Sequence, residues 1–179
     1  MADRDHAAIL ASRVAVVHRL LLDAVSACTD EDLAWIPGPT SPPIAFHLWH
    51  CGRWADRWAE ALSGHQQRWH REDLTTKWKF PAEQGNGDTG MSLPAEQVAL
   101  LPFPGRDQMA TYLRGAFSDL EHALAELDDE SILRDADDLL GAEAPLADSL
   151  TRQLSHASRH LGMIEALRGL RGGPGTATL

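Results

Sequence analysis

Apolar residues recur at steps of three and four along four long stretches of this chain, which is the spacing of an amphipathic helix. The stretches cover roughly residues 5–28, 41–64, 106–127 and 145–170. In the first stretch the apolar positions are Leu10, Val14, Val17, Leu21 and Ala24. No segment shows a convincing alternation of apolar and polar residues, so the pattern predicts an all-α protein without strands.

Helix-boundary signals accompany this pattern. Ser41-Pro42-Pro43 offers an N-cap serine ahead of prolines, which lose no needed hydrogen bond in a first helical turn. Ser63-Gly64 and Gly172-Gly173-Pro174-Gly175 are stop signals. We therefore expect one domain over residues 1–171, followed by a flexible C-terminal tail at residues 172–179.

Four amphipathic helices of this length bury their apolar stripes most economically as a four-helix bundle. About 40 residues separate the second long helix from the third, and a segment of this length is uncommon in a compact domain unless it is functional. Such a segment can cross the whole length of a bundle. We therefore predict a long crossover between helices 2 and 3, which allows these two helices to lie parallel.

Composition and charge narrow the classes of function. The chain has 179 residues, a formal net charge of -10 and scattered lysines and arginines, so it offers no basic surface to nucleic acid. No apolar stretch approaches the roughly 20 residues of a membrane span, and the charged N-terminal residues do not form a signal peptide. Cys28 and Cys51 are too few for a disulfide framework. We expect a cytoplasmic protein with no nucleic-acid and no membrane partner.

Histidines form two pairs at helical spacing. His156 and His160 are four residues apart, so their rings lie one above the other on a helix face. His47 and His50 are three residues apart in the second long stretch. Neutral imidazole is the commonest protein ligand of transition metals, and facing helices of a bundle are a usual place for metal sites. The two pairs predict a metal site, and spacing leaves open whether His47 or His50 is the ligand.

Several residues near these pairs have a simpler structural interpretation. Cys51 lies four residues after His47, which makes this pair a geometric rival, although a buried thiol is favoured. Arg53 and Asp56 are expected on an exposed, salt-bridged helix face. Glu165 is favoured as a solvated charge, with a supporting role beside the metal as the alternative.

The tryptophans divide into two groups. Trp49, Trp54 and Trp58 lie at helical spacing and are expected to pack in the core or on the surface of the bundle. Trp69 and Trp78 fall in the crossover and are candidates for lining a pocket above the metal, or for a dimer contact. The remaining histidines have no partner at useful spacing and are expected at the surface. They are His6, His18, His65, His70 and His122.

Three segments resemble the DinB/YfiT-like superfamily. Pro43-Ile-Ala-Phe-His-Leu-Trp-His50-Cys-Gly-Arg-Trp-Ala-Asp56 is similar to the signature of its second helix. His156-Ala-Ser-Arg-His160-Leu-Gly162 is similar to its last-helix motif, and Gly87-Asp-Thr-Gly90-Met91 resembles the linker of one subgroup. The resemblance implies a four-helix bundle with the long crossover and one metal held by three histidines.

Carried over to this chain, those three metal ligands are His50, His156 and His160. The resemblance gives His47 a place in the pocket or beside the ligands. His47 and Trp78 are the candidates for binding a cofactor, and no catalytic residue is assigned. The metal is expected to be one divalent transition ion, with zinc favoured and nickel or iron as alternatives.

The resemblance also implies a reaction. Some members of the superfamily transfer low-molecular-weight thiols such as mycothiol, bacillithiol or glutathione onto electrophiles, and others isomerise maleylpyruvate with a thiol cofactor. We therefore expect a metal-dependent enzyme that uses a metal-bound thiolate, with a small-molecule thiol and an electrophile as partners, and with a homodimer as a candidate assembly. The alternatives are a metal-binding stress-response or ligand-binding module without turnover, and a metal-dependent hydrolase.

Overall fold

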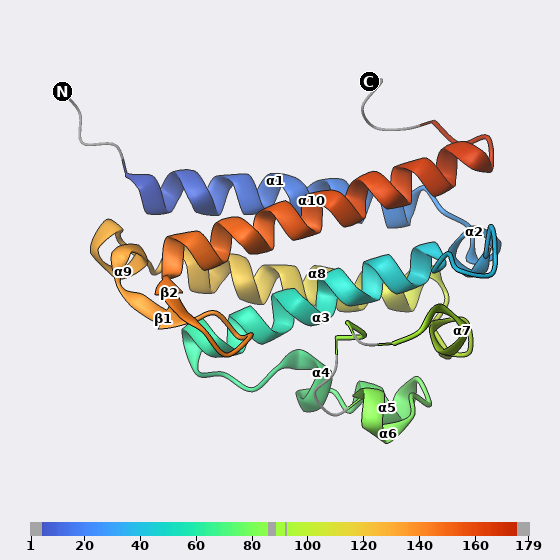
Figure 1. The fold of residues 1–179 in the computed structure, drawn as a ribbon, viewed down its shortest axis with the longest axis horizontal. Coiled ribbons are helices and arrows are strands. Elements are labelled where there is room, and N and C mark those ends of the chain that lie inside the picture. The colour runs from blue at the N-terminus through green and yellow to red at the C-terminus, as the bar shows by residue number, and fades with distance from the viewer. Residues whose placement is uncertain (1–4, 86–88, 92, 175–179) are drawn as a thin grey trace.

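The computed structural model describes residues 5–85, 89–91 and 93–174. Within these ranges the long helices are α1 (His6–Ser26), α3 (Ile44–Ser63), α8 (Arg106–Ala125) and α10 (Leu146–Leu170). They lie side by side along the longest axis of the molecule (Figure 1). Helices α1 and α3 each pack against both α8 and α10, and we call these four helices the bundle. The predicted helical fold class is confirmed.

The directions of the long helices follow from the crossover. In Figure 1, α1 and α10 run from left to right, whereas α3 and α8 run from right to left. The parallel arrangement of α3 and α8 is the one that a long crossover allows. The described part of this crossover carries the short helices α4 (Arg68–Arg71), α5 (Leu74–Lys77), α6 (Ala82–Gly85) and α7 (Ala95–Val98).

The remaining elements connect the long helices at their ends. Helix α2 (Asp30–Ala34) follows α1, and α9 (Asp129–Leu133) follows α8. Strands β1 (Asp135–Asp137) and β2 (Glu143–Pro145) then form an antiparallel hairpin before α10. The hairpin corrects the expectation of a chain without strands. Each strand has only 3 residues, which is too short to show an alternation in the sequence.

Helix α3 is the most deeply buried of the long helices. It begins at Ile44, after Pro43 and without a side-chain cap, so the predicted N-cap at Ser41 lies too early. It ends at Ser63, and its C-cap Gly64 has a φ of 74°, a left-handed conformation that glycine adopts without a steric penalty. A Cβ atom at Gly52 would lie 2.7 Å from Cε1 of Tyr112, so glycine lets α8 approach α3 closely.

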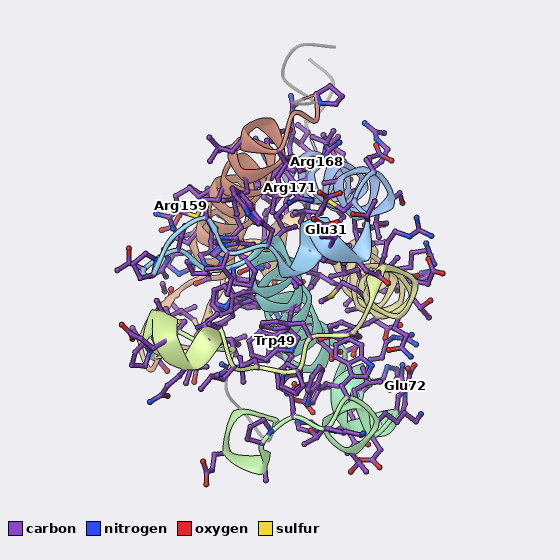
Figure 2. All side chains as sticks on the ribbon, turned by 90° about the vertical axis from the view of Figure 1, so that its right-hand side faces the viewer. Glu31, Trp49, Glu72, Arg159, Arg168 and Arg171 are labelled. Atoms are coloured by element: carbon purple, nitrogen blue, oxygen red, sulfur yellow. The ribbon has the colours of Figure 1, made fainter. Side chains whose placement is uncertain are left out.

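The crossover tryptophans belong to an aromatic cluster between α3, α8 and the crossover. Trp69 is fully buried, and its ring centroid lies 6.0 Å from that of Trp49 and 5.6 Å from that of Tyr112. Trp78 is buried too, with its ring centroid 5.5 Å from that of Tyr112. Trp49 lies on the side of α3 that faces the crossover (Figure 2). This cluster attaches the crossover to the bundle.

Two predictions concern residues that lie partly outside the described part of the chain. Residues 87 and 88 of the linker resemblance and residues 175–179 of the predicted flexible tail lie outside them. Helix α10 ends at Leu170, and the backbone N–H of Gly173 donates a hydrogen bond of 2.9 Å to the carbonyl of Arg168.

None of the described helices combines the length and apolarity that crossing a membrane requires.

Candidate metal centre

Three histidines meet where α3 packs against α10. These helices are antiparallel, so His50 faces His156 and His47 faces His160. Nε2 of His156 lies 3.1 Å from Nε2 of His50 and 3.1 Å from Nε2 of His160. One ligand atom from each of His50, His156 and His160 lies within 4.8 Å of the others. Three imidazole nitrogens therefore converge on one point, and this group, the histidine cluster, can hold a metal ion.

The crossover orients His50. Nδ1 of His50 is hydrogen-bonded to the backbone carbonyl of Thr89, so Nδ1 carries the proton and donates it. The lone pair of Nε2 is then free to point at the other histidines, as a metal ligand requires. Gly90 has a φ of 85°, and a Cβ atom there would lie 2.8 Å from the rings of Phe46 and Trp49. Glycine at position 90 thus lets the crossover reach His50.

His47 orients His160 in the way that the Thr89 carbonyl orients His50. The Nδ1 atoms of the two rings lie 2.8 Å apart. Because Nε2 of His160 points into the histidine cluster, its Nδ1 is the atom that donates and Nδ1 of His47 accepts. The spacing allows either His47 or His50 to be a ligand. The three-residue cluster contains His50, whereas His47 is outside the cluster and contacts Nδ1 of His160.

Burial keeps the imidazoles of His47, His156 and His160 uncharged at neutral pH. It lowers the pKa of His47 to about 4. Burial, joined by the charges of the neighbouring histidines and of Arg159, lowers the pKa of His160 to about 2. Burial and the charge of Arg159 also lower the pKa of His156. Uncharged imidazoles with free lone pairs are the form that binds a divalent transition metal, so the residues present fit such an ion.

A pocket of about 450 Å³ opens beside His156, and we call it the His156 pocket. Its apolar walls come from α3, the crossover and the β1–β2 hairpin, and its charged side chains from α10 and the hairpin. The apolar residues are Trp54, Trp58, Met91 and Leu140, and the charged ones are Asp138, Arg152 and Arg159. A small molecule in this pocket would contact His156.

The model of the DinB superfamily matches residues 14–164, which is most of the chain. The chain belongs to the DinB superfamily. Its fold is similar to the crystal structure of a conserved protein from Enterococcus faecalis, with a TM-score of 0.78, 16% identity, and coverage of 93% of this chain and 96% of that chain. A DinB-like protein from Bacillus cereus gives a TM-score of 0.57 at 18% identity and covers 87% of this chain and 86% of that chain. No curated protein matches the sequence.

The two predicted cofactor-binding residues of this DinB superfamily member lie in different places. His47 lies beside the histidine cluster. Trp78 packs against Trp69 and Tyr112 and is not among the residues that line the His156 pocket, so a binding role for Trp78 stays a prediction. Trp54 and Trp58, expected only to pack, are buried and also line the pocket. Their helical spacing does not distinguish these two roles.

Arg53 and Asp56 correct the expectation of an exposed face, because both are buried in this DinB fold. The carboxylate of Asp56 accepts the backbone N–H groups of Arg68 at 2.7 Å and Trp69 at 2.8 Å. Arg53 lies 3.6 Å from Asp56 and donates a hydrogen bond of 2.9 Å to Gln67. Burial raises the pKa of Asp56, against these hydrogen bonds and the charge of Arg53, which lower it. This Arg53–Asp56 cluster positions the start of α4.

Three other expectations concern single side chains. His18 is buried rather than exposed: its ring stacks on Phe117 at 4.0 Å, and its Nδ1 lies 2.7 Å from the carboxylate of Glu121. Its place on the apolar stripe of the first helix is a signal that would have indicated burial. Cys51 is a buried thiol, as favoured, and burial raises its pKa. Glu165 is half-buried and does not belong to the histidine cluster.

Proposed function

We propose that this DinB superfamily protein is a metal-dependent enzyme that transfers a low-molecular-weight thiol of the mycothiol or bacillithiol class onto an electrophile. The observation that carries the proposal is the convergence of three imidazole nitrogens beside the His156 pocket. Three protein ligands leave the fourth position of a tetrahedral zinc site to water or a substrate. A divalent ion bound here would supply acidity, because a coordinating thiol loses its proton near neutral pH.

The protein's own contribution is orientation. The Thr89 carbonyl holds His50 with Nε2 pointing inward, and Nδ1 of His47 holds His160 in the same way. Such partners fix the direction of each lone pair and raise the basicity of the ring. Trp54 and Trp58 give the His156 pocket a buried apolar wall, against which the body of an electrophile would pack.

A metal-dependent hydrolase has less support. Such an enzyme needs a general base near the ion, and the described group that can hold a metal consists of histidines alone. Asp138 is the acid that lines the His156 pocket. The backbone N–H groups of Ala142 and Leu140 lower its pKa, and its carboxylate lies 3.2 Å from Arg152. A carboxylate stabilised in this way is a poor base.

Thiol conjugation with zinc-loaded protein tests the proposal. Mycothiol, bacillithiol and glutathione are each mixed with the protein and monochlorobimane, and the fluorescent conjugate is followed. We expect at least one thiol to react faster than without protein. The acceleration should disappear with a chelator and in His156→Ala, and it should persist in His122→Ala, which replaces an exposed histidine of α8. A protein that binds zinc but accelerates none of the three reactions is a binding module without turnover.

A further inference from the structure

The His156 pocket holds a positive charge that none of the described residues neutralises. Arg152 is paired, because its Nη1 lies 3.2 Å from Asp138 and its Nη2 donates a 3.2 Å hydrogen bond to Ser149. Arg159 has no ion pair and no hydrogen bond within the described part of the chain. The charged residues lining the pocket therefore leave one net positive charge, in a protein whose formal net charge is -10.

The arginine that follows α10 shows the contrast. Arg171 caps the C-terminal end of the helix and lies 2.9 Å from Glu31 and 2.8 Å from Asp32. Figure 2 shows Arg171 close to Glu31, with Arg159 on the other side of α10. The charge of Arg159 instead acts on His156 and His160. An unpaired guanidinium beside the histidine cluster attracts an anion to the place where the proposed chemistry occurs.

The pocket also contains hydrogen-bonding groups that find no partner in the described residues. Nε1 of Trp54 and Nδ1 of His156 are buried without a hydrogen bond. The amide of Gln153 is nine-tenths buried and makes none. All three residues line the pocket. Buried polar groups are normally paired, and an indole N–H can only donate. The Trp54 and His156 nitrogens have almost no accessible surface, whereas the amide of Gln153 can be reached from the pocket, and a ligand that supplies an acceptor atom would satisfy that amide.

We infer that the His156 pocket binds a small organic carboxylate with an apolar body. The planar guanidinium of Arg159 matches a carboxylate through two parallel hydrogen bonds. Trp54 and Trp58 offer flat apolar surfaces to the body of the molecule, and a volume of about 450 Å³ suits a small molecule. That this anion is the electrophile of the thiol transfer rests on the proposed function, whereas its binding requires only the pocket.

Calorimetric titration of zinc-loaded protein tests this inference with matched probes. Phenylacetate carries both the charge and the apolar body, phenylacetamide has the body without the charge, and acetate has the charge without the body. We expect phenylacetate to bind at least about tenfold more tightly than either probe, since a hydrogen bond to a charged group is worth this much. Equal affinities for phenylacetate and phenylacetamide would overturn the inference.

Two variants identify the residue that recognises the charge. Arg159→Gln should reduce the preference for phenylacetate to about twofold or less, because the guanidinium and its charge are removed. Arg114→Gln, at an exposed position on α8, should keep the preference. Metal analysis of each variant confirms that its zinc content is unchanged. A preference that survives in Arg159→Gln and disappears in zinc-free protein means that the carboxylate binds the metal, which contradicts the inference.

The failure of this inference differs from the failure of the proposed function. If the protein prefers phenylacetate but conjugates no thiol, the carboxylate site is supported and the transferase activity is contradicted. If the protein conjugates a thiol but shows no preference for phenylacetate, the transferase activity is supported and the carboxylate site is contradicted.

Discussion

Two pairs of polar residues lie buried on α3, two turns apart, and the fold treats them differently. His47 and His50 face α10, whereas Arg53 and Asp56 face the crossover. The carboxylate of Asp56 is satisfied by two backbone N–H groups, and the guanidinium of Arg53 lies 4.8 Å from the ring centroid of Trp69. The two charges compensate each other within the chain.

In the histidine pair both side chains contact nitrogens of other histidines: Nδ1 of His47 contacts His160, and Nε2 of His50 contacts His156. Nε2 of His50 faces Nε2 of His156 at 3.1 Å, so lone pairs of the histidine cluster converge. Burial of polar side chains alone therefore does not indicate a functional site. What distinguishes the histidine cluster is a set of lone pairs whose natural partner is a cation from outside the chain.

The largest effect on stability is expected from the Arg53–Asp56 cluster. Asp56→Ala leaves Arg53 buried without its carboxylate and two backbone N–H groups without an acceptor. We expect the free energy of unfolding to fall by about 3–5 kcal/mol, with zinc bound per folded chain unchanged. Denaturant unfolding and metal analysis measure the two quantities, and Asp56→Asn, which keeps the shape, is the milder variant. Loss of zinc from folded Asp56→Asn would contradict the separation of the two clusters.

The next effect concerns the support of His160. His47→Ala removes the acceptor of the His160 Nδ1–H group, so we expect zinc affinity to fall by about 10–100-fold. Competition with a chromophoric chelator measures this affinity, and His122→Ala is the matched control. An unchanged affinity would mean that His47 does not orient His160. Complete loss of zinc would mean that His47 is itself a ligand.

The pH dependence of the zinc-free protein separates the histidines from the carboxylates. The pKa of His47 is lowered to about 4 by burial, against about 6.5 in an unfolded chain. The unfolded state therefore binds more protons in this range, and stability present above about pH 6.5 is lost as the pH falls towards 4. In His47→Leu we expect a smaller loss between pH 7 and 4.5, measured by urea unfolding. An equal loss in both proteins would show that His47 does not contribute.

The smallest effect is expected at the contact between the crossover and α3. Gly90→Ala adds a Cβ atom 2.8 Å from the rings of Phe46 and Trp49, which displaces the Thr89 carbonyl from His50. Gly172→Ala is the control, since its φ of 83° carries the same backbone cost and nothing lies within 4 Å. We expect a several-fold loss of zinc affinity in Gly90→Ala only. Equal affinities in the two variants would show that the crossover does not position His50.

Much of the fold can be predicted from the sequence, because four long helices each carry a continuous apolar stripe. The pattern places the second long helix at residues 41–64, and the structure has α3 at Ile44–Ser63. The β1–β2 hairpin cannot be predicted in this way. Its strands are held by a turn in which Asp138 accepts the backbone N–H groups of Leu140 and Ala142, and this arrangement leaves no periodic signal.

The candidate site, like the fold, can be predicted from the sequence only in part. His156 and His160 can be recognised from their spacing, because both partners lie on one helix. The preference for His50 over His47 comes from the resemblance alone, since it depends on Thr89, which lies 39 residues away in the chain. The burial of Arg53 and Asp56 depends on α4, a short helix in a segment without periodicity. The periodic pattern of the sequence does not predict the interactions that irregular segments make with the helices.

The zinc content and coordination of the wild-type protein and of His156→Ala test most directly whether three histidines bind one metal. We predict about one equivalent of zinc per wild-type chain, with three imidazole nitrogens at about 2.0–2.1 Å in X-ray absorption and one further light ligand. His156→Ala should lose the zinc, and His122→Ala should retain it. One full equivalent of zinc in folded His156→Ala, with an unchanged coordination shell, would contradict the histidine cluster as the metal site.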